Sequence, residues 1–260
     1  MDDLKPIIEE YPLDYCRMLE DVYGIGLMSE GGTKAIDDLF IDISLEGKKV
    51  LDLGSGLGGF AFYLSEKYNC SVLGLEINEN MNKEAIKRTP AELKNKVDFL
   101  TYSKISEIPV ESNSFDIISS KGVLVHVNEK LTLFKELHRI LKEDGTLIIN
   151  DWLCSNIGTW SEDIQKMCEL EKLTLYPFTV ESYSEIFNKS DFKIKKIENK
   201  SEKYAEYNME LVNYLKKNKE EFIKKYNEKT WKENIQGYEL ISKSQLNNEL
   251  LLIEFTATKN

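Results

Sequence analysis

The stretch VLDLGSGLGGF, from Val50 to Phe60, constrains the fold more than any other part of the chain. Its aliphatic half predicts a buried strand that runs directly into four glycines, at positions 54, 56, 58 and 59. Gly54, Gly56 and Gly59 satisfy the pattern G-x-G-x-x-G, a tight turn that brings backbone N–H groups and a helix N-terminus against a ligand. Several nucleotide-type cofactors use this turn, so the pattern alone leaves the cofactor open.

Strand-like and helical patterns alternate along the hundred or so residues around this turn. Strands are predicted at 48–53, 71–77, 96–102, 114–120 and 145–151, and helices at 58–68, at 78–88 and before Gly145. Alternation at this spacing predicts a mostly parallel sheet with helices on both faces. After Asp151 the rhythm breaks, with two helices in 155–190, a strand at 192–199, a charged helical segment at 201–235 and an apolar last strand at 249–259.

We therefore expect an α/β fold with a Rossmann-like sheet and a single domain over residues 1–260. Within it we expect N-terminal cap helices (1–45) and a core that holds the cofactor (46–151). An inserted helical lid with one strand (155–240) and the final strand (249–259) complete the predicted layout.

Composition narrows the function classes. The net charge of −11 and the isoelectric point of about 4.9 disfavour a nucleic-acid partner, because an acidic surface repels phosphate backbones. The four cysteines are far apart and form no C-x-x-C pair, so neither a zinc site nor a disulfide framework is expected. The acidic N-terminal stretch does not resemble a signal peptide, and no apolar run is long enough to span a membrane. These features predict a cytoplasmic protein without a metal site.

Two carboxylates near the glycine turn bear on the cofactor. Asp52 lies two residues before Gly54, where a negative charge suits a sulfonium and an ammonium group better than a pyrophosphate. Glu76 ends the second strand, where it can accept both hydroxyls of a ribose in either a dinucleotide or S-adenosyl-L-methionine (SAM). Together with FDIISS (115–120), LKEDGTLIIND (141–151) and the last strand, this region resembles the class I SAM-dependent methyltransferases. In that family the last strand is antiparallel.

The resemblance implies a set of cofactor contacts. Ser29, with Gly31 and Gly32, would shape the pocket for the SAM carboxylate. Many members of the family carry an acidic residue for the adenine amine where this chain has Tyr102 and Ser103, so a serine hydroxyl or a backbone carbonyl would substitute. The full predicted set is Ser29, Asp52, Gly54, Ser55, Gly56, Gly59, Glu76, Ile77, Tyr102, Ser103 and Lys121.

A narrower resemblance covers nearly the whole chain. YGIGLMSEGGTKAIDDL (23–39), LDLGSGLGG (51–59), LVHV (124–127), FTVESY (178–183) and ATKN (257–260) resemble the phosphoethanolamine N-methyltransferases of protozoan parasites and nematodes. In that family a tyrosine and a histidine act together on the acceptor amine. The matching residues here are Tyr11 and His126, which are the predicted catalytic pair.

The chemistry of methyl transfer agrees with a histidine at this position. The enzyme needs mainly a deprotonated amine held in line with the methyl group. An imidazole with a pKa near 6.5 can take the amine proton at cytosolic pH. The second histidine, His138, lies in the middle of a predicted helix and is expected to be an ordinary, partly exposed residue.

The acceptor side departs from the family. The family binds the acceptor phosphate with an arginine, a tyrosine and a lysine, and our alignment places Glu171, Leu173 and Ile241 at these positions. Gly122 stands where the family has an acidic residue facing the amine. Tyr23 and Trp152 are the predicted acceptor residues, because aromatic faces attract methylated ammonium groups.

The sequence thus predicts a SAM-dependent methyltransferase acting on a small-molecule acceptor, with an amine as the first expectation. The alternatives are a small-molecule O- or C-methyltransferase, a catalytically silent SAM-binding protein, and an NAD-dependent oxidoreductase that uses the same glycines. The sequence does not indicate an oligomeric state.

Overall fold

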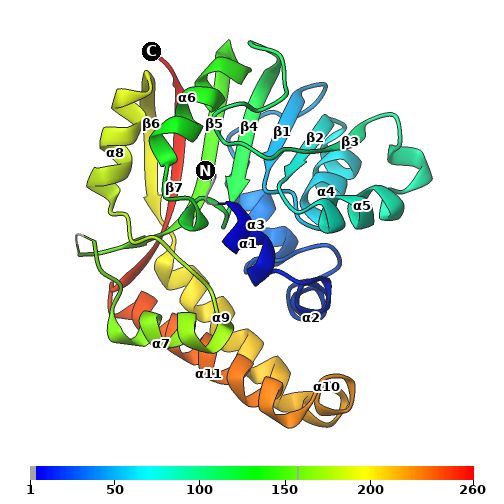
Figure 1. Cartoon of the computed structure of the whole chain (residues 1–260), viewed down its shortest axis with the longest axis vertical. Coiled ribbons are helices and arrows are strands. Elements are labelled where there is room, and N and C mark those ends of the chain that lie inside the picture. The colour runs from blue at the N-terminus through cyan, green and yellow to red at the C-terminus, as the bar shows by residue number, and fades with distance from the viewer. Residues whose placement is uncertain (1–3, 157) are drawn as a thin grey trace.

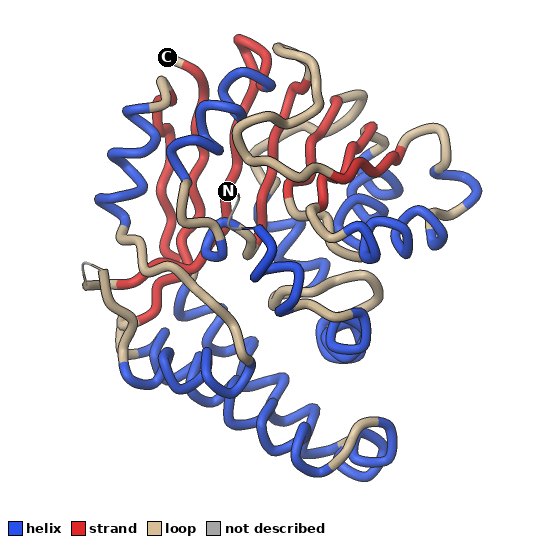
Figure 2. Tube along the Cα trace, in the orientation of Figure 1, coloured by secondary structure: helices blue, strands red, loops and turns tan. Residues whose placement is uncertain are grey.

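A sheet of seven strands forms the centre of the molecule (Figures 1 and 2). The structure is a computed structural model that describes residues 4–156 and 158–260. The strand order is β3-β2-β1-β4-β5-β7-β6, and β7 runs antiparallel to both of its neighbours while the other pairs are parallel. The predicted Rossmann-like α/β fold with an antiparallel last strand is therefore confirmed. The strands are β1 (Lys49–Leu53), β2 (Ser71–Glu76), β3 (Val97–Thr101), β4 (Phe115–Lys121), β5 (Leu141–Cys154), β6 (Phe192–Asn199) and β7 (Leu250–Lys259).

Helices cover both faces of the sheet because successive strand residues point to opposite sides. Val50 packs with residues of α3 (Gly32–Leu39) and α4 (Gly59–Tyr68), whereas its neighbour Leu51 packs with residues of α6 (Lys130–Ile140) and α8 (Val180–Lys189). On β4, Ile117 packs in the same cluster as Val50, and Ile118 packs in the same cluster as Leu51. Helix α5 (Glu79–Arg88) contacts β3 and β2.

A second helical layer lies below the sheet in the orientation of Figure 1. It consists of α7 (Glu162–Glu171), α9 (Ser201–Lys217), α10 (Lys219–Lys225) and α11 (Glu228–Leu246). Its apolar side chains form one cluster with those of α2 (Leu13–Tyr23), and α1 (Leu4–Glu10) precedes α2. None of the described helices is long and apolar enough to cross a membrane.

The segment predicted as one inserted lid (155–240) divides into two parts in the structure. Tyr183 and Phe187 of α8 are buried against the sheet, and β6 forms its edge, so 180–199 belongs to the core layer. The second helical layer is formed by the remaining helices. The charged segment 201–235 is not one helix: it breaks at Asn218, and the Asn227 side chain caps α11 by accepting the Thr230 N–H at 2.8 Å. Residues 1–3 of the predicted cap and residue 157 lie outside the described residues.

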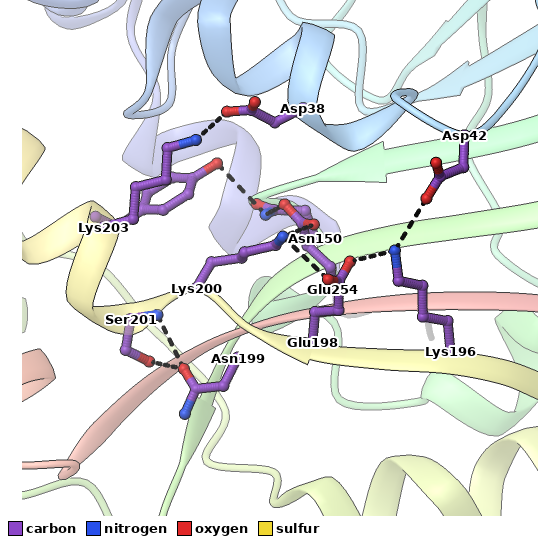
Figure 3. A network of polar contacts seen from close by, with 11 residues as sticks. Asp38, Asp42, Asn150, Lys196, Glu198, Asn199, Lys200, Ser201, Lys203 and Glu254 are labelled. Atoms are coloured by element: carbon purple, nitrogen blue, oxygen red, sulfur yellow. Dashed lines mark hydrogen bonds and ion pairs between the residues drawn. The ribbon is translucent and has the colours of Figure 1, made fainter.

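A network of polar side chains attaches the start of α9 to the sheet (Figure 3). The Glu254 carboxylate of β7 accepts a hydrogen bond from Asn150 of β5 at 3.0 Å and lies 3.6 Å from the ammonium group of Lys200. Lys203 of α9 pairs with Asp38 of α3. Because these contacts join three elements to one helix, the first turn of α9 is held to the sheet.

Candidate active site

A cavity opens at the carboxyl ends of β1, β2 and β4, where ligands bind in open α/β sheets. Its wall combines the turns that follow these strands with α1 and the segment between α2 and α3. Eleven of the predicted site residues line it: Tyr11, Ser29, Asp52, Gly54, Ser55, Gly56, Glu76, Ile77, Tyr102, Lys121 and His126. Four do not: Tyr23, Gly59, Ser103 and Trp152.

The glycine turn follows β1 as the sequence predicts. The backbone N–H groups of Gly54 and Ser55 both donate to the carbonyl of Leu75, at 2.8 and 3.0 Å, which folds the turn back onto β2. Gly54 has a φ of +80°, and a Cβ atom there would overlap the Val123 side chain in the cavity wall. Only glycine therefore fits at this position.

Gly59 is used for a close backbone contact and is not among the described residues that line the cavity, so its assignment as a cofactor residue stays a prediction. Its N–H donates to the carbonyl of Gly26 at 3.1 Å, and a Cβ atom on it would lie 2.5 Å from the Gly26 carbonyl carbon. This close backbone approach brings the loop before Ser29 against the start of α4. The third glycine of the pattern thus sets the position of the N-terminal segment over the cavity.

Asp52 is a buried acid without a hydrogen-bond partner for one of its oxygens. Its side chain is in the cavity wall, and Oδ2 has no partner among the described residues. Burial raises the pKa of Asp52 to about 8, with a smaller contribution from the charge of Glu76. A buried carboxyl group without a partner is costly, so this atom is suited to a ligand that brings a positive charge or a hydrogen-bond donor.

Glu76 is also buried, but the backbone supports it. Its two carboxylate oxygens accept the N–H groups of Gly56 and Asn78, each at 2.9 Å. Burial raises the pKa of Glu76, whereas these N–H groups and that of Ile77 lower it. Each carboxylate oxygen can accept a further hydrogen bond, so the group remains available to ligand hydroxyls.

The third strand contributes less than predicted. Tyr102 is buried in the cavity wall, but Ser103 is exposed and does not line the cavity. The assignment of Ser103 as a cofactor residue is therefore not supported by its place in the structure. The physical reason is that the chain turns outward after Tyr102, whose N–H donates to the carbonyl of Glu76 at 3.2 Å.

Lys121 connects the end of β4 to the N-terminal segment. Its ammonium group donates to the Ser29 hydroxyl at 2.9 Å and to the Glu30 carbonyl at 2.6 Å. Burial lowers the pKa of Lys121 to about 8, while the charges of Glu30 and Glu254 oppose this change. Lys121 therefore fixes the loop that carries Ser29 across the cavity.

His126 and Tyr11 are in direct contact. The Tyr11 hydroxyl lies 3.1 Å from Nε2 of His126, and the two rings meet edge to face with centroids 5.5 Å apart. His126 follows β4 in the short helix η2 (Leu124–His126), and only 8% of its surface is exposed. The sequence analysis assumed an ordinary histidine pKa, and the structure corrects this. Burial lowers the pKa of His126 to about 4, and the charge of Lys130 adds to the effect, while the Thr174 backbone opposes it.

Beyond Tyr11 lies a group of aromatic and acidic side chains from α2, α7 and the loop before α3. The rings of Tyr11 and Tyr15 lie 5.8 Å apart, and the Tyr15 hydroxyl donates to Glu171 at 2.9 Å. Burial raises the pKa of Glu171 to about 7; the Tyr15 hydrogen bond opposes this shift and the charge of Glu30 adds to it. We call Tyr11, Tyr15, Glu30 and Glu171 the acceptor side.

Trp152 and Tyr23 are not among the described residues that line the cavity, and their assignment as acceptor contacts stays a prediction. Trp152 uses its indole N–H to donate to the Glu30 carboxylate at 2.9 Å. The Tyr23 ring packs edge to face on Tyr238 at 6.0 Å between centroids. Sequence reasoning missed Tyr15, Glu30 and Tyr238, because these residues lie far apart in the chain and carry no local motif.

Comparison with known proteins extends these observations. A family described as a methyltransferase domain matches residues 51–149. The phosphoethanolamine N-methyltransferase of Plasmodium falciparum is 31% identical over 255 residues, covering 96% of this chain and 94% of that protein. Phosphoethanolamine N-methyltransferase 1 of Zea mays is 27% identical and is matched by 84% of this chain over 43% of its own length.

A solved structure shares the fold over the full chain. Phosphoethanolamine N-methyltransferase 2 of Haemonchus contortus, in complex with SAM, superposes with a TM-score of 0.89 at 23% identity. It is matched by 100% of this chain over 60% of its own length. This chain therefore spans about half of the plant and nematode relatives, but nearly the whole of the Plasmodium protein. The choice between a dinucleotide and SAM is thereby resolved: the chain belongs to the phosphoethanolamine N-methyltransferase family of SAM-dependent methyltransferases.

Proposed function

We propose that this enzyme transfers a methyl group from SAM to the nitrogen of a small amine that carries no phosphate. The proposal rests on the side chains that line the cavity at the carboxyl ends of β1, β2 and β4. Its wall holds an unpartnered carboxyl group, Asp52, together with a buried histidine–tyrosine pair, His126 and Tyr11. Asp52 suits a cationic cofactor, and the histidine–tyrosine pair suits an amine.

The residues of the cofactor side fit SAM. In this proposal Asp52 neutralises the positive charge of the cofactor, Glu76 accepts its ribose hydroxyls, and the turn at Gly54–Gly56 lets the backbone approach it without a Cβ atom between them. Ser29, held by Lys121, lies at the opposite wall. When bound, SAM supplies an electrophilic methyl group on its sulfonium.

His126 and Tyr11 would orient the acceptor. A pKa of about 4 keeps His126 neutral at physiological pH. A neutral Nε2 without a proton can accept a hydrogen bond, either from an amine N–H or from the Tyr11 hydroxyl. The same burial disfavours a protonated amine, because desolvation lowers the pKa of a buried ammonium group. His126 is thus a weak base in a site that already favours the neutral, nucleophilic amine.

The acceptor side disfavours an anionic substrate. Several relatives are phosphoethanolamine methyltransferases by name, yet Glu171 and Glu30 both influence the pKa of Tyr11, the residue that contacts His126. Two unit charges about 6 Å apart interact with roughly 3 kcal/mol at an effective dielectric constant of about 20. The pKa of Glu171 lies at about 7, so its carboxyl group is only partly ionised at neutral pH. An acceptor phosphate near the ionised form would meet repulsion of up to this order, whereas an uncharged or cationic end would not.

The test is an acceptor panel with purified protein and SAM, read by S-adenosylhomocysteine release and by mass analysis of the product. We expect kcat/KM for free amines such as ethanolamine or 1,3-diaminopropane to exceed that for phosphoethanolamine at least tenfold. Preference for phosphoethanolamine would overturn the proposed acceptor class. SAM binding by calorimetry without turnover of any amine in the panel would overturn the transferase proposal and favour a silent binding protein.

A matched pair of variants on α7 isolates the effect of the Glu171 charge. Glu171→Gln keeps an acceptor for the Tyr15 hydroxyl while removing the charge, and Glu169→Gln makes the same change at an exposed position of the same helix. We expect Glu171→Gln alone to raise kcat/KM for phosphoethanolamine, with little change for ethanolamine. An equal effect of both variants would mean that the net charge of the helix matters and not the site.

A further inference from the structure

The turn that carries His126 is fastened on both sides by buried charged residues. The N–H group of Val125, which precedes the histidine, donates to Asp151 Oδ1 at 3.1 Å. The carbonyl of Val127, which follows it, accepts from the Lys130 ammonium group at 2.5 Å. The carbonyl of Val125 also accepts the Tyr176 N–H at 2.8 Å. The peptide groups around His126 are therefore held from β5, from α6 and from the loop before α8.

Both charged residues are almost fully enclosed by protein. Asp151 is completely buried at the carboxyl half of β5, and its second oxygen accepts the Tyr183 hydroxyl. Lys130 is 1% exposed, and its ammonium group lies 3.9 Å from the centre of the Phe178 ring. The two opposite charges attract each other: burial raises the pKa of Asp151 and lowers that of Lys130, and each charge opposes the shift of the other.

Stability alone does not explain such a pair. Removing two charges from water is costly, and well-packed apolar residues of similar volume commonly stabilise a core as well or better. Neither Asp151 nor Lys130 is among the described residues that line the cavity, so neither contacts a ligand there. The two side chains instead form hydrogen bonds with the backbone on either side of His126, which lies in the cavity wall.

We propose that Asp151 and Lys130 are positioning residues, a buried ionic clamp that holds the His126 turn so that Nε2 meets the Tyr11 hydroxyl. Asp151 fixes the turn before the histidine and Lys130 fixes it after. The effect on catalysis rests on the proposed function, whereas the effect on the histidine ring does not. Position matters because displacing a reacting group by about 1 Å can lower a rate by about 10²-fold.

Nuclear magnetic resonance of the histidine rings tests the clamp without any acceptor. The chain has only two histidines, so ring ¹⁵N signals of histidine-labelled protein are assigned with one variant, His138→Gln. We expect a single, narrow set of His126 signals in the wild type that changes in Tyr11→Phe, because the hydroxyl contact is lost. The variants to compare are Asp151→Asn, Lys130→Met and the double variant.

The double variant separates positioning from folding. Each single variant leaves one buried charge without its opposite, so Lys130→Met and Asp151→Asn are both expected to lower the unfolding midpoint for that reason alone. The double variant removes both charges and should recover most of the unfolding midpoint. If the clamp positions His126, its ring signals still shift or split in the double variant. With the amine that the acceptor panel identifies, kcat then falls at least tenfold while both KM values change less than twofold.

Asp116→Asn is the matched control, because Asp116 also accepts a backbone N–H, from Lys49 at 2.8 Å, and a lysine ammonium, from Lys142 at 2.8 Å. It lies at the start of β4, at the opposite end of the strand from the cavity, and should leave the His126 signals unchanged. Wild-type His126 signals in a stable double variant would overturn the clamp, whatever its turnover. Altered His126 signals in a protein that methylates no amine would instead support the clamp and contradict the proposed function.

Discussion

Glu76 on the cofactor side and Glu171 on the acceptor side both have a pKa raised by burial, but the protein holds the two carboxyl groups in different ways. Glu76 is fixed by two backbone N–H groups, one from the glycine turn and one from the residue two positions later. Glu171 is fixed by a side chain, the Tyr15 hydroxyl, from a helix 156 residues away in sequence. Backbone N–H groups are present whatever the side chains are, whereas the Tyr15 contact depends on one particular residue.

This difference shows where the family can vary. The cofactor side is built from one strand–turn–helix unit, so any chain that keeps the glycines and the acid keeps the site. The acceptor side is assembled from α2, α7 and the loop before α3, so single substitutions there can change the charge that meets the substrate. In our proposal, this chain keeps the cofactor of the family and uses a different acceptor.

The largest expected effect lies at the boundary between the two sides. His126→Ala should lower turnover by about 10²-fold, because in our proposal it removes the group that orients the acceptor amine. SAM affinity, measured by calorimetry, should change little. His138→Ala, a partly exposed helix residue, is the control for loss of a histidine as such. A His126→Ala enzyme that turns over the acceptor at the wild-type rate would make His126 a structural residue.

On the cofactor side, Glu76→Ala should weaken SAM binding by about 10–100-fold. The estimate follows from losing charge-assisted hydrogen bonds worth about 1.5–3 kcal/mol each. KM for the acceptor should stay within a factor of about two if the two sides are as separate as the comparison suggests. Because Glu76 also holds Gly56 and Asn78, the unfolding midpoint is measured in parallel, and Glu76→Gln serves as the conservative control. Unchanged SAM affinity would remove Glu76 from the cofactor site.

A third test concerns Asp52, whose pKa is about 8 before any ligand binds. A cationic cofactor favours the ionised carboxylate, so below pH 8 binding must release the proton that Asp52 carries. SAM affinity should therefore rise about tenfold per pH unit from pH 6 to 8 and level off above. Calorimetry in buffers of different ionisation enthalpy would count the released proton. Asp52→Asn should abolish this slope, and an unchanged slope in that variant would assign the proton to another group.

Most of the cofactor side could be predicted from the sequence, whereas most of the acceptor side could not. The strands β1 to β5, Asp52, Glu76 and the glycine turn were predicted from local pattern, since strands and turns of this unit are set by neighbouring residues. The spatial order of the strands was not predicted. His126 and Tyr11 were found through resemblance alone, and the structure then brought them together across 115 residues of sequence. The acceptor side could not be predicted, because no local signal places Tyr15 next to Glu171.

The structure also places some predicted residues in contacts that the sequence does not reveal. Gly59 fits the glycine pattern, and its lack of a side chain is used for contact with Gly26. Trp152 lies near the end of β5, and its indole N–H donates to the Glu30 carboxylate. The pKa of His126 was set by burial, which a sequence does not report.

The smallest expected effect concerns motion of the segments that cover the cavity. SAM must enter and leave, while methyl transfer needs water excluded, so part of the covering structure should close on binding.

The structure restricts which part of the covering structure moves. The Tyr11 carbonyl before α2 accepts the Asn78 amide at 3.2 Å, and Glu20 of α2 pairs with Arg88 of α5, whereas the start of α9 is tied to β7 through Lys200 and to α3 through Lys203. We therefore expect amide hydrogen exchange to slow severalfold in α1, α2 and α7 when S-adenosylhomocysteine is added, with little change at the start of α9. Helix α8 and strand β6, which fall in the predicted lid segment but pack in the core layer, provide the internal control. Equal protection of α8, β6 and α2 would indicate general stabilisation by the ligand. Selective protection of α1, α2 and α7 would mean that the acceptor side is completed only after the cofactor side is filled.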